Sequence, residues 1–386
     1  MRIEVEDASL EAPLRGIEAT LQDHGGYVAD DLIVRERGGQ FSCAIGTRYG
    51  EPGRILLSYD PALRTPLSRI DWASDGSLRP TGGLTGLTTP QRALLEAWLE
   101  LVLHTGKLEQ VRAAYPDFSV TSWPLRQHLA AAGFPSLLAE STDVDVRTQL
   151  FRSHSALAAR PRNPPACFLI PLKHLVNHDP TGADQLPLPG RTALATSRSS
   201  DATETFENYG AMDALQLLMN LGFVSRRPDF VHSAPVTVES TTLGRIHVAG
   251  RPKRAAVALA PDAAVAPDVP LFLVRGDGVD IAHLTIRAGN RATVSRLIAM
   301  AIRSRGNQVG AAAEAEQLLD DVLTANQSFY QRMDDLLVDA IAEAKLQPSA
   351  QSGAPATGNG SVVPSVLLEL AAVSKHQQQL LQSSWR

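Results

Sequence analysis

The sequence predicts an α+β protein in which a β region is interrupted by a helical insert and followed by a mainly helical C-terminal part. Three observations predict this class. Short apolar runs separated by turn residues occur before residue 60 and again between 166 and 209, as expected for strands. Residues 89–160 show helical spacing between these two regions. Residues 291–346 keep an apolar period of about 3.6 residues, which is typical of helices.

The N-terminal part combines one short helix with several short strands. Leu14, Ile17 and Leu21 share one helix face, and Gly25-Gly26 ends that helix. Glycine pairs and a Gly-Glu-Pro-Gly turn separate the runs that follow. The predicted strands are 31–34, 41–45 and 55–57.

The central part is predicted to be helical. Thr89 is the predicted N-cap of its first helix, with Pro90 at the first helical position and Gly106 at the end. A second helix is expected over about 143–159. The apolar face of the first helix consists of Leu94, Leu95, Trp98, Leu101 and Val102.

The C-terminal half returns to strands and then becomes helical. Strands are expected within 166–176 and 203–209, a helix over 212–222, and a mixed part over 236–288. Residues 347–364 are rich in Ser, Gly and Pro and are predicted to form a mobile linker. A last helix is expected over about 365–381 and is expected to dock on the 311–345 helices through Leu367, Leu370, Leu380 and Leu381. Truncation at Gln347 is expected to leave a folded protein.

The amino-acid composition limits the classes of function that this protein can have. The 386 residues correspond to about two to three domains at roughly 150 residues each. The net charge of −5, from 36 basic and 41 acidic residues, argues against general attraction to nucleic acid or anionic membranes. Two cysteines, Cys43 and Cys167, exclude a disulfide scaffold and a Cys-rich zinc cluster.

Location is predicted from the same composition. The first residues lack the apolar core of a secretory signal, and no run approaches 18 consecutive apolar residues. Together with the low cysteine content, this predicts a cytoplasmic protein without a membrane partner. The sequence does not indicate an oligomeric state.

Most catalytic motifs are missing from the sequence, including a P-loop, a dinucleotide-binding glycine motif and a Gly-x-Ser-x-Gly elbow. His174 and His178 are four residues apart, a spacing that binds zinc when it falls on a helix. Leu175, however, occupies the position of the glutamate that a zinc protease needs, and Pro171 disfavours a helix. We therefore expect no metal, and a metal hydrolase stays an alternative for metal analysis to test.

Two segments carry a family resemblance. The first is Phe168-Leu-Ile-Pro-Leu-Lys-His-Leu-Val-Asn-His178. The second is Phe206-Glu-Asn-Tyr-Gly-Ala-Met-Asp-Ala-Leu-Gln-Leu-Leu-Met-Asn-Leu-Gly-Phe-Val224, whose Tyr209 follows His178 by 31 residues. Together they resemble the two signature segments of SET-domain protein methyltransferases, in the branch of the Rubisco large-subunit lysine methyltransferase. The positions in register with that branch are Pro171, Asn177-His178, Tyr209-Gly210, Leu217-Leu218 and Gly222-Phe223.

The resemblance extends outward and also has departures. Segments 53–61 and 150–156 are similar to two further family segments, and the order of β and helical regions is that of the branch. Residues 40–43, Gln-Phe-Ser-Cys, stand where the family has a glycine-rich segment. At single family positions, His174 replaces an aspartate, His154 an arginine, Ala214 an asparagine and Leu221 a tyrosine.

The resemblance implies a SET fold and the cofactor S-adenosyl-L-methionine. It implies that Tyr209 directs its hydroxyl at the methyl group and aligns the nucleophile. It implies that Asn177 bonds the methionine part of the cofactor and that His178 holds the adenine, mainly through its backbone. His154 takes the position of the arginine that anchors the cofactor's carboxylate.

The resemblance also implies a protein substrate and no nucleic acid. Backbone carbonyls at Ser153 and His174 would surround the target nitrogen, and the Phe223 ring would line the target channel. The implied activity is N-methylation of a lysine side chain. Histidine is an alternative target, because a neutral imidazole is abundant at neutral pH. A non-catalytic binding protein on a SET scaffold is the second alternative, motivated by the four departures.

The implied domains combine the resemblance with the composition. The SET core is expected over 14–65 and 165–235, with the helical insert at 66–164. A mainly helical domain similar to a substrate-docking domain is expected over 236–346. The linker 347–364 and a C-terminal helical segment, 365–386, complete the chain.

Overall fold

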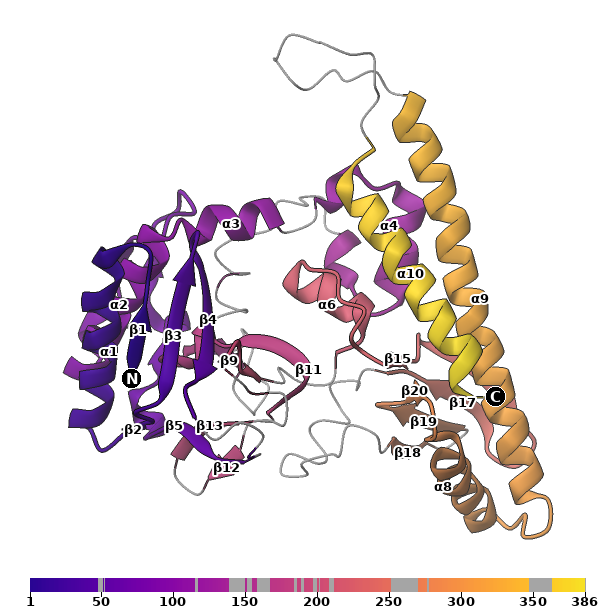
Figure 1. The fold of residues 1–386 in the computed structure, drawn as a ribbon. Helices are drawn as coiled ribbons and strands as arrows, with labels where there is room; N and C mark the ends of the chain where they lie inside the picture. Colours follow the sequence, from indigo (N-terminus) through magenta and orange to yellow (C-terminus); the bar gives the residue numbers. More distant parts are fainter. Residues whose placement is uncertain are drawn as a thin grey trace. The chain divides into compact units, whose positions relative to one another are not determined.

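The chain forms two compact units in the computed structural model (Figure 1), and each is described by itself. Unit 1 comprises Met1–Tyr115 and Val144–Ala211, and unit 2 comprises Pro116–Asp143 and Met212–Arg386. The structure describes residues 1–47, 51, 53–114, 117–138, 150, 155–157, 167–183, 186–188, 191–196, 200, 202–207, 212–250, 270–275, 278–346 and 363–385. Both units mix helices with small sheets, which confirms the α+β class.

The helices of unit 1 follow the predicted periodicity. Helix α1 (Glu11–Asp23) buries Leu14, Ile17 and Leu21 and packs against α2 (Thr89–His104). The predicted cap at Thr89 is wrong by one residue. Thr88 Oγ1 accepts from Gln91 N, and the Gln91 side chain accepts from Thr88 N in return, so this reciprocal pair fixes the helix start. Helix α3 is Lys107–Ala114.

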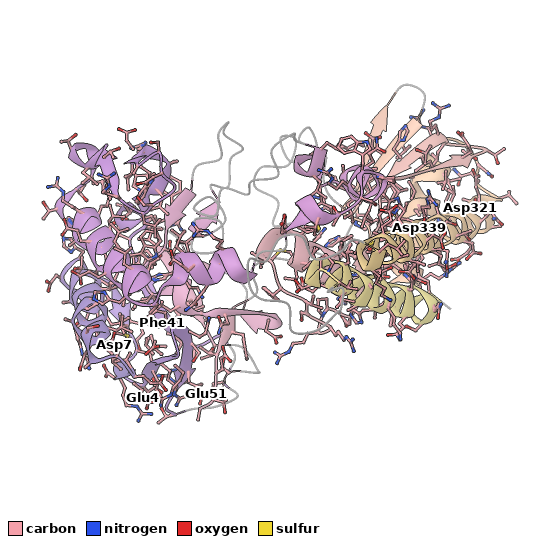
Figure 2. All side chains as sticks on the ribbon, turned by 90° about the horizontal axis from the view of Figure 1, so that it is seen from above. Glu4, Asp7, Phe41, Glu51, Asp321 and Asp339 are labelled. Atoms are coloured by element: carbon pink, nitrogen blue, oxygen red, sulfur yellow. The ribbon has the colours of Figure 1, made fainter. Side chains whose placement is uncertain are left out.

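The strands of unit 1 form several small sheets. In the first, β3 (Leu32–Arg37) lies between β1 (Arg2–Glu4), which is parallel to it, and β4 (Gln40–Ile45), which is antiparallel. Arg35 Nε donates to Glu4 Oε2 at 2.7 Å, which links β3 to β1. Glu4 is labelled in Figure 2. The second sheet has the order β12-β13-β5-β2, formed by Leu186–Leu188, Arg191–Ala195, Ile55–Tyr59 and Tyr27–Val28.

The remaining strands of unit 1 pair in short ladders. The prediction of a helix as far as 159 is wrong, because Ser155–Leu157 is strand β9 and pairs with β10 (Cys167–Leu169). Residues 143–149 of that predicted helix lie outside the described part. Strand β10 also pairs with β6 (Thr65–Pro66). The other pairs are β11 (Asn177–Ala183) with β14 (Phe206–Glu207), and β7 (Asp71–Trp72) with β8 (Pro80–Gly82).

Unit 2 is built around long helices and a sheet of order β16-β17-β19-β18. The 36-residue helix α9 (Ala311–Leu346) packs against α8 (Arg291–Ser304) and α10 (Ser365–Ser384) (Figure 1). The shorter helices are α4 (Trp123–Ala131) and α6 (Ala214–Leu221). The strands are β15 (Phe230–His232), β16 (Val236–Ser240), β17 (Gly244–Val248), β18 (Leu271–Arg275), β19 (Gly278–Ala282) and β20 (Thr285–Arg287).

Short 3-10 helices connect several of these elements. They are η1 (Ala8–Leu10), η2 (Pro61–Leu63), η3 (Leu67–Arg69), η4 (Leu84–Gly86), η5 (Phe118–Val120), η6 (Pro135–Leu138) and η7 (Lys173–Leu175). Of these, η7 lies directly before β11 and belongs to the first signature segment. Within the described part of the chain, we find no helix with the length and apolarity that a bilayer crossing requires.

The two units divide the chain elsewhere than at the predicted boundaries. Residues 66–115, predicted as insert, are part of unit 1, whereas α4 packs in unit 2. The predicted SET core of 165–235 is divided between Ala211 and Met212. The predicted docking of the C-terminal helix on residues 311–345 is confirmed, because α10 packs against α9. The buried side chains of α10, which include Leu367, pack within unit 2. Most of the predicted linker lies outside the described residues.

Candidate functional site

The β3–β4 hairpin of unit 1 turns on Gly38 and Gly39, which both have positive φ, 54° and 79°. Two such residues are what a two-residue hairpin turn requires. Space also selects glycine at position 39, because a Cβ there would lie 2.4 Å from Gln110 Nε2 and 2.9 Å from Thr105 O. The hairpin turn therefore packs closely against the start of α3.

The second edge of β4 meets the first signature segment and the residues directly before the second one. Thr205 N donates to Cys43 O at 2.6 Å, and Asn177 Nδ2 donates to Phe41 O at 3.2 Å. Phe41 is labelled in Figure 2. The same amide nitrogen of Asn177 donates to Glu204 Oε1 at 2.6 Å. Asn177 is exposed, and these two bonds use both of its amide hydrogens, which leaves Oδ1 as an acceptor for another group.

His174 lies in η7, three residues before Asn177. Its Nδ1 is 3.2 Å from Ile170 O. Burial lowers the pKa of His174 to about 4, the bond to Ile170 acts in the opposite direction, and the positive charge of Lys107 adds to the lowering. The imidazole is therefore neutral at physiological pH.

The turn that leads into η7 is strained. Leu172, between Pro171 and η7, has a φ of 58°, a conformation that branched side chains rarely adopt. Its side chain is buried in the core of unit 1 together with Leu175 and Val176. Such strain costs on the order of 1–3 kcal/mol and persists only where the surrounding packing imposes it. The core thus fixes the backbone from which His174 and Asn177 project.

The predicted site residues are only partly brought together. Asn177 and His174 lie close together in sequence on η7 and β11, and the backbone of His178 pairs with Glu207 of β14. Phe223 follows the C-cap glycine of α6 in unit 2 and is 39% exposed. Three of the predicted residues, Ser153, His154 and Tyr209, lie outside the described part of the chain.

The two histidines of the metal alternative do not share a helix. His174 belongs to a 3-10 turn and His178 to strand β11, so the zinc-binding geometry of a helical pair is not formed. Among the described side chains, no group of three or more His, Cys, Asp or Glu could hold a metal ion. Burial, and secondarily the charge of Glu204, raises the pKa of Cys43 to about 12, so that thiol is not a nucleophile.

Sequence reasoning missed three residues of this site: Glu204, Gln40 and Lys107. Gln40 Oε1 accepts from Lys107 Nζ at 3.2 Å, and Gln40 Nε2 donates to Gln110 Oε1 at 2.7 Å. The available signal for Lys107 was its position directly after the helix-ending Gly106, where a charged side chain can reach a neighbouring turn. No sequence pattern indicates that the backbone carbonyl of Phe41 takes part in this site.

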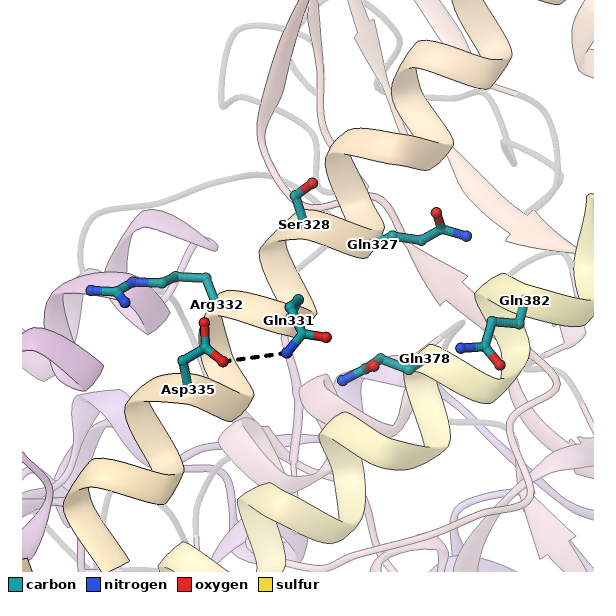
Figure 3. A pocket seen from close by; sticks show the side chains of 7 residues that line it. All are labelled: Gln327, Ser328, Gln331, Arg332, Asp335, Gln378 and Gln382. Carbon is teal, nitrogen blue, oxygen red and sulfur yellow. Dashed lines mark hydrogen bonds between the residues drawn. The ribbon is translucent and has the colours of Figure 1, made fainter. Parts of the chain in front are cut away.

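A polar hollow of about 440 Å³ lies between α9 and α10 of unit 2 (Figure 3). Gln331 Nε2 donates to Asp335 Oδ1 at 3.3 Å in this hollow. Amide and hydroxyl side chains dominate its lining, and it contains no pairing of a nucleophile with a base. The lining residues are Gln327, Ser328, Gln331, Arg332, Asp335, Gln378 and Gln382.

No family model matches this chain, and no curated protein matches it. Solved structures do show a likeness. One of them is the crystal structure of the SET domain of LSMT bound to lysine and AdoHcy, with 12% sequence identity over 98% of this chain and 91% of that chain. The TM-score is 0.36. Because this value is well below 0.5, the likeness does not establish a shared fold.

Proposed function

We propose that this protein is an S-adenosyl-L-methionine-dependent protein methyltransferase that acts on a lysine side chain. The observation that carries the proposal is the bond from Asn177 Nδ2 to Phe41 O. The signature resemblance assigns Asn177 to the cofactor, and Phe41 lies in the segment that replaces the family's glycine-rich one. These two segments are 136 residues apart in the chain, yet they meet in unit 1.

The acceptor groups on this edge fit the amino-acid end of the cofactor. That end carries an ammonium group, which needs acceptors. Asn177 Oδ1 is an acceptor, and the carboxylate of Glu204 lies within 2.6 Å of the amide nitrogen of the same side chain. Asn177 and Glu204 would therefore hold the ammonium of the bound cofactor.

Methyl transfer from this cofactor does not require the protein to form a covalent bond with the substrate. When bound, the cofactor would supply a sulfonium methyl group to a neutral amine: the N–C bond would form as the S–C bond breaks, the thioether would leave, and the methylated amine would lose a proton to water if it became neutral again. At pH 7.4 only about one lysine in a thousand is neutral, given its reference pKa of about 10.4. The contribution of the chain is to orient the amine and keep it out of water, which favours the neutral form. By resemblance, the Tyr209 hydroxyl performs the orienting step.

The proposal is tested by replacing Asn177 with alanine. Because this removes a hydrogen-bonding partner from the cofactor, we expect binding of S-adenosylmethionine to weaken by about 1–3 kcal/mol in titration calorimetry. Asn307→Ala is the matched control. Asn307 is hydrogen-bonded to Glu314 in unit 2, and its loss should leave cofactor affinity unchanged. Equal affinity of the wild type and a folded Asn177→Ala protein would contradict the assignment.

Activity is tested separately from binding. Wild-type protein incubated with labelled S-adenosylmethionine and a cell lysate should transfer label to protein, and amino-acid analysis of the product should find methyl-lysine. Methyl-histidine would identify the alternative target. Cofactor binding without any transfer would favour the non-catalytic alternative.

A further inference from the structure

Lys107 is a cation without a counterion among the described residues. It is the first residue of α3 and is partly buried. Its Nζ donates to Gln40 Oε1, the oxygen of a neutral amide, at 3.2 Å. Burial lowers the pKa of Lys107, and no carboxylate of the described part of the chain acts to raise it.

The groups around Lys107 do not offset the cost of burying its charge without a counterion. Removing an ammonium from water without an ionic partner costs free energy, and the first turn of a helix adds the positive partial charge of its N–H groups. Two carbonyls at the end of α2 already accept hydrogen bonds. Leu101 O accepts from Thr105 N and Oγ1, and Leu103 O accepts from Gly106 N. An anion bound beside Lys107 would offset this cost.

Lys107 and Asn177 form hydrogen bonds with adjacent residues of β4. The Lys107 ammonium reaches Gln40, and the Asn177 amide reaches Phe41, the next residue of β4. The charge of Lys107 also acts on His174, which precedes Asn177 by three residues. The first two residues of β4 are thus bonded to a cation at Gln40 and, at Phe41, to an amide that also bonds the Glu204 carboxylate. A ligand with a carboxylate and an ammonium on one carbon, an α-amino acid, matches this pair of charges.

We propose that Lys107 binds the α-carboxylate of the methionine part of the cofactor, while Asn177 and Glu204 accept hydrogen bonds from its α-ammonium. This inference rests on the proposed function and extends it by one residue that the signature segments do not contain. In this chain Lys107 supplies a cation for the carboxylate, a role for which the family has an arginine at the position of His154. An ammonium on a helix start thus replaces a guanidinium.

The test compares S-adenosylmethionine with decarboxylated S-adenosylmethionine, which differs only by the carboxylate. A hydrogen bond to a charged group contributes roughly 1.5–3 kcal/mol, or about 10–100-fold in affinity. Wild-type protein should therefore bind the complete cofactor at least about tenfold more tightly. Lys107→Met, which keeps the apolar stem, should bind both ligands within about twofold of each other. Lys107→Arg should retain most of the preference.

The design distinguishes a binding role from a structural one. The affinity for the decarboxylated ligand reports whether the site is intact, since that ligand does not use the Lys107 charge. Lys375→Met, which removes an exposed lysine of α10, is the matched control and should keep the wild-type ratio. A wild-type ratio near one, or an unchanged ratio in Lys107→Met, would overturn the inference while leaving the proposed function intact. Failure of the wild type to bind either ligand would overturn the proposed function itself.

Discussion

Asn177 is committed to the protein through its two amide hydrogens, so only its oxygen is available to a cofactor. This restricts what an asparagine at this position can recognise. It can accept from an ammonium or a hydroxyl, but it cannot donate to a carboxylate without breaking its bond to Phe41 or Glu204. Another donor must then recognise the carboxylate, and Lys107 is the residue proposed for this role. The resemblance alone did not divide the two ends of the amino acid between two residues.

Tyr209 carries the catalytic part of the proposal, and its test is kinetic. Tyr209→Phe keeps the ring and removes only the hydroxyl. We expect methyl transfer to fall by about 10²-fold or more, because a positioning group stabilises the transition state rather than the bound ground state. Cofactor affinity should change by less than about tenfold in calorimetry on the same preparation. Full activity in this variant would contradict the resemblance at its most informative residue.

His174 makes the stability of the protein depend on pH. Burial lowers its pKa to about 4, so in acid the unfolded chain binds a proton that the folded chain does not bind. The contribution of the neutral His174 to the free energy of unfolding is complete above the reference pKa of about 6.5 and is lost as the pH falls towards 4. Between pH 7.5 and 5 we expect a loss of roughly 2 kcal/mol in the free energy of unfolding, measured by urea denaturation.

Two variants isolate this effect. His174→Asn keeps a donor towards Ile170 O but does not titrate, so its unfolding free energy should fall by less than that of the wild type over the same range. His24 is exposed, and His24→Asn should follow the wild type. Asp31, paired with Arg54, has a pKa of about 2 and does not interfere, because its contribution is lost only below about pH 4. Identical pH profiles for wild type and His174→Asn would show that His174 titrates normally.

Among the elements, helices were predicted best, because the spacing of their apolar residues indicates directly which side chains are buried. The stripe of α1 and the apolar face of α2 are buried as expected. The failure at Ser155–Leu157 has a physical reason. A three-residue strand is held by its ladder to β10, and a segment this short carries no period of its own. The cap at Thr88 could be found, since a Thr followed three residues later by Gln is a capping box.

Helix α10 closes the core of unit 2. The Trp385 Nε1 atom donates to Asn290 Oδ1 at 2.7 Å, and the Arg291 guanidinium donates to Trp385 O at 3.0 Å. Fully burying one large apolar side chain contributes roughly 1.5–3 kcal/mol. A domain is stable by only about 5–15 kcal/mol. The apolar residues of α10 that are buried are Val366, Leu367, Leu370, Val373 and Leu381.

Removing residues 347–386 is therefore expected to unfold unit 2, in contrast to the expectation from sequence. Hydrogen exchange should show loss of protection in α9 and β15, whereas β3, β4 and β5 of unit 1 keep theirs. Leu370→Ala and Leu368→Ala form a matched pair on the same helix. The first should destabilise by about 2–5 kcal/mol, and the second, which is 55% exposed, by much less. Retained protection of α9 in the truncated chain would contradict this account.

For the whole molecule, the sequence predicted the class and the order of segments but not their assignment to units. Helix α4 illustrates why. The spacing of Leu125 and Leu129 indicates that these side chains lie on one buried face of the helix. The spacing does not identify the element that covers this face. The partner is α9, where the His128 ring stacks on Phe329 at 4.1 Å between centroids. Contacts between segments so far apart depend on shape complementarity that a single sequence does not display.

That stacking pair has a consequence for biosynthesis. His128 and Phe329 are 201 residues apart, and ribosomes add roughly 5–20 residues per second. Helix α4 therefore leaves the ribosome about 10–40 s before the helix that covers it. During that interval α4 lacks its α9 neighbour, with His128 unstacked, while much of unit 1 has already been translated. A nascent chain of this protein should therefore engage holding chaperones through α4, and release them only when α9 has emerged.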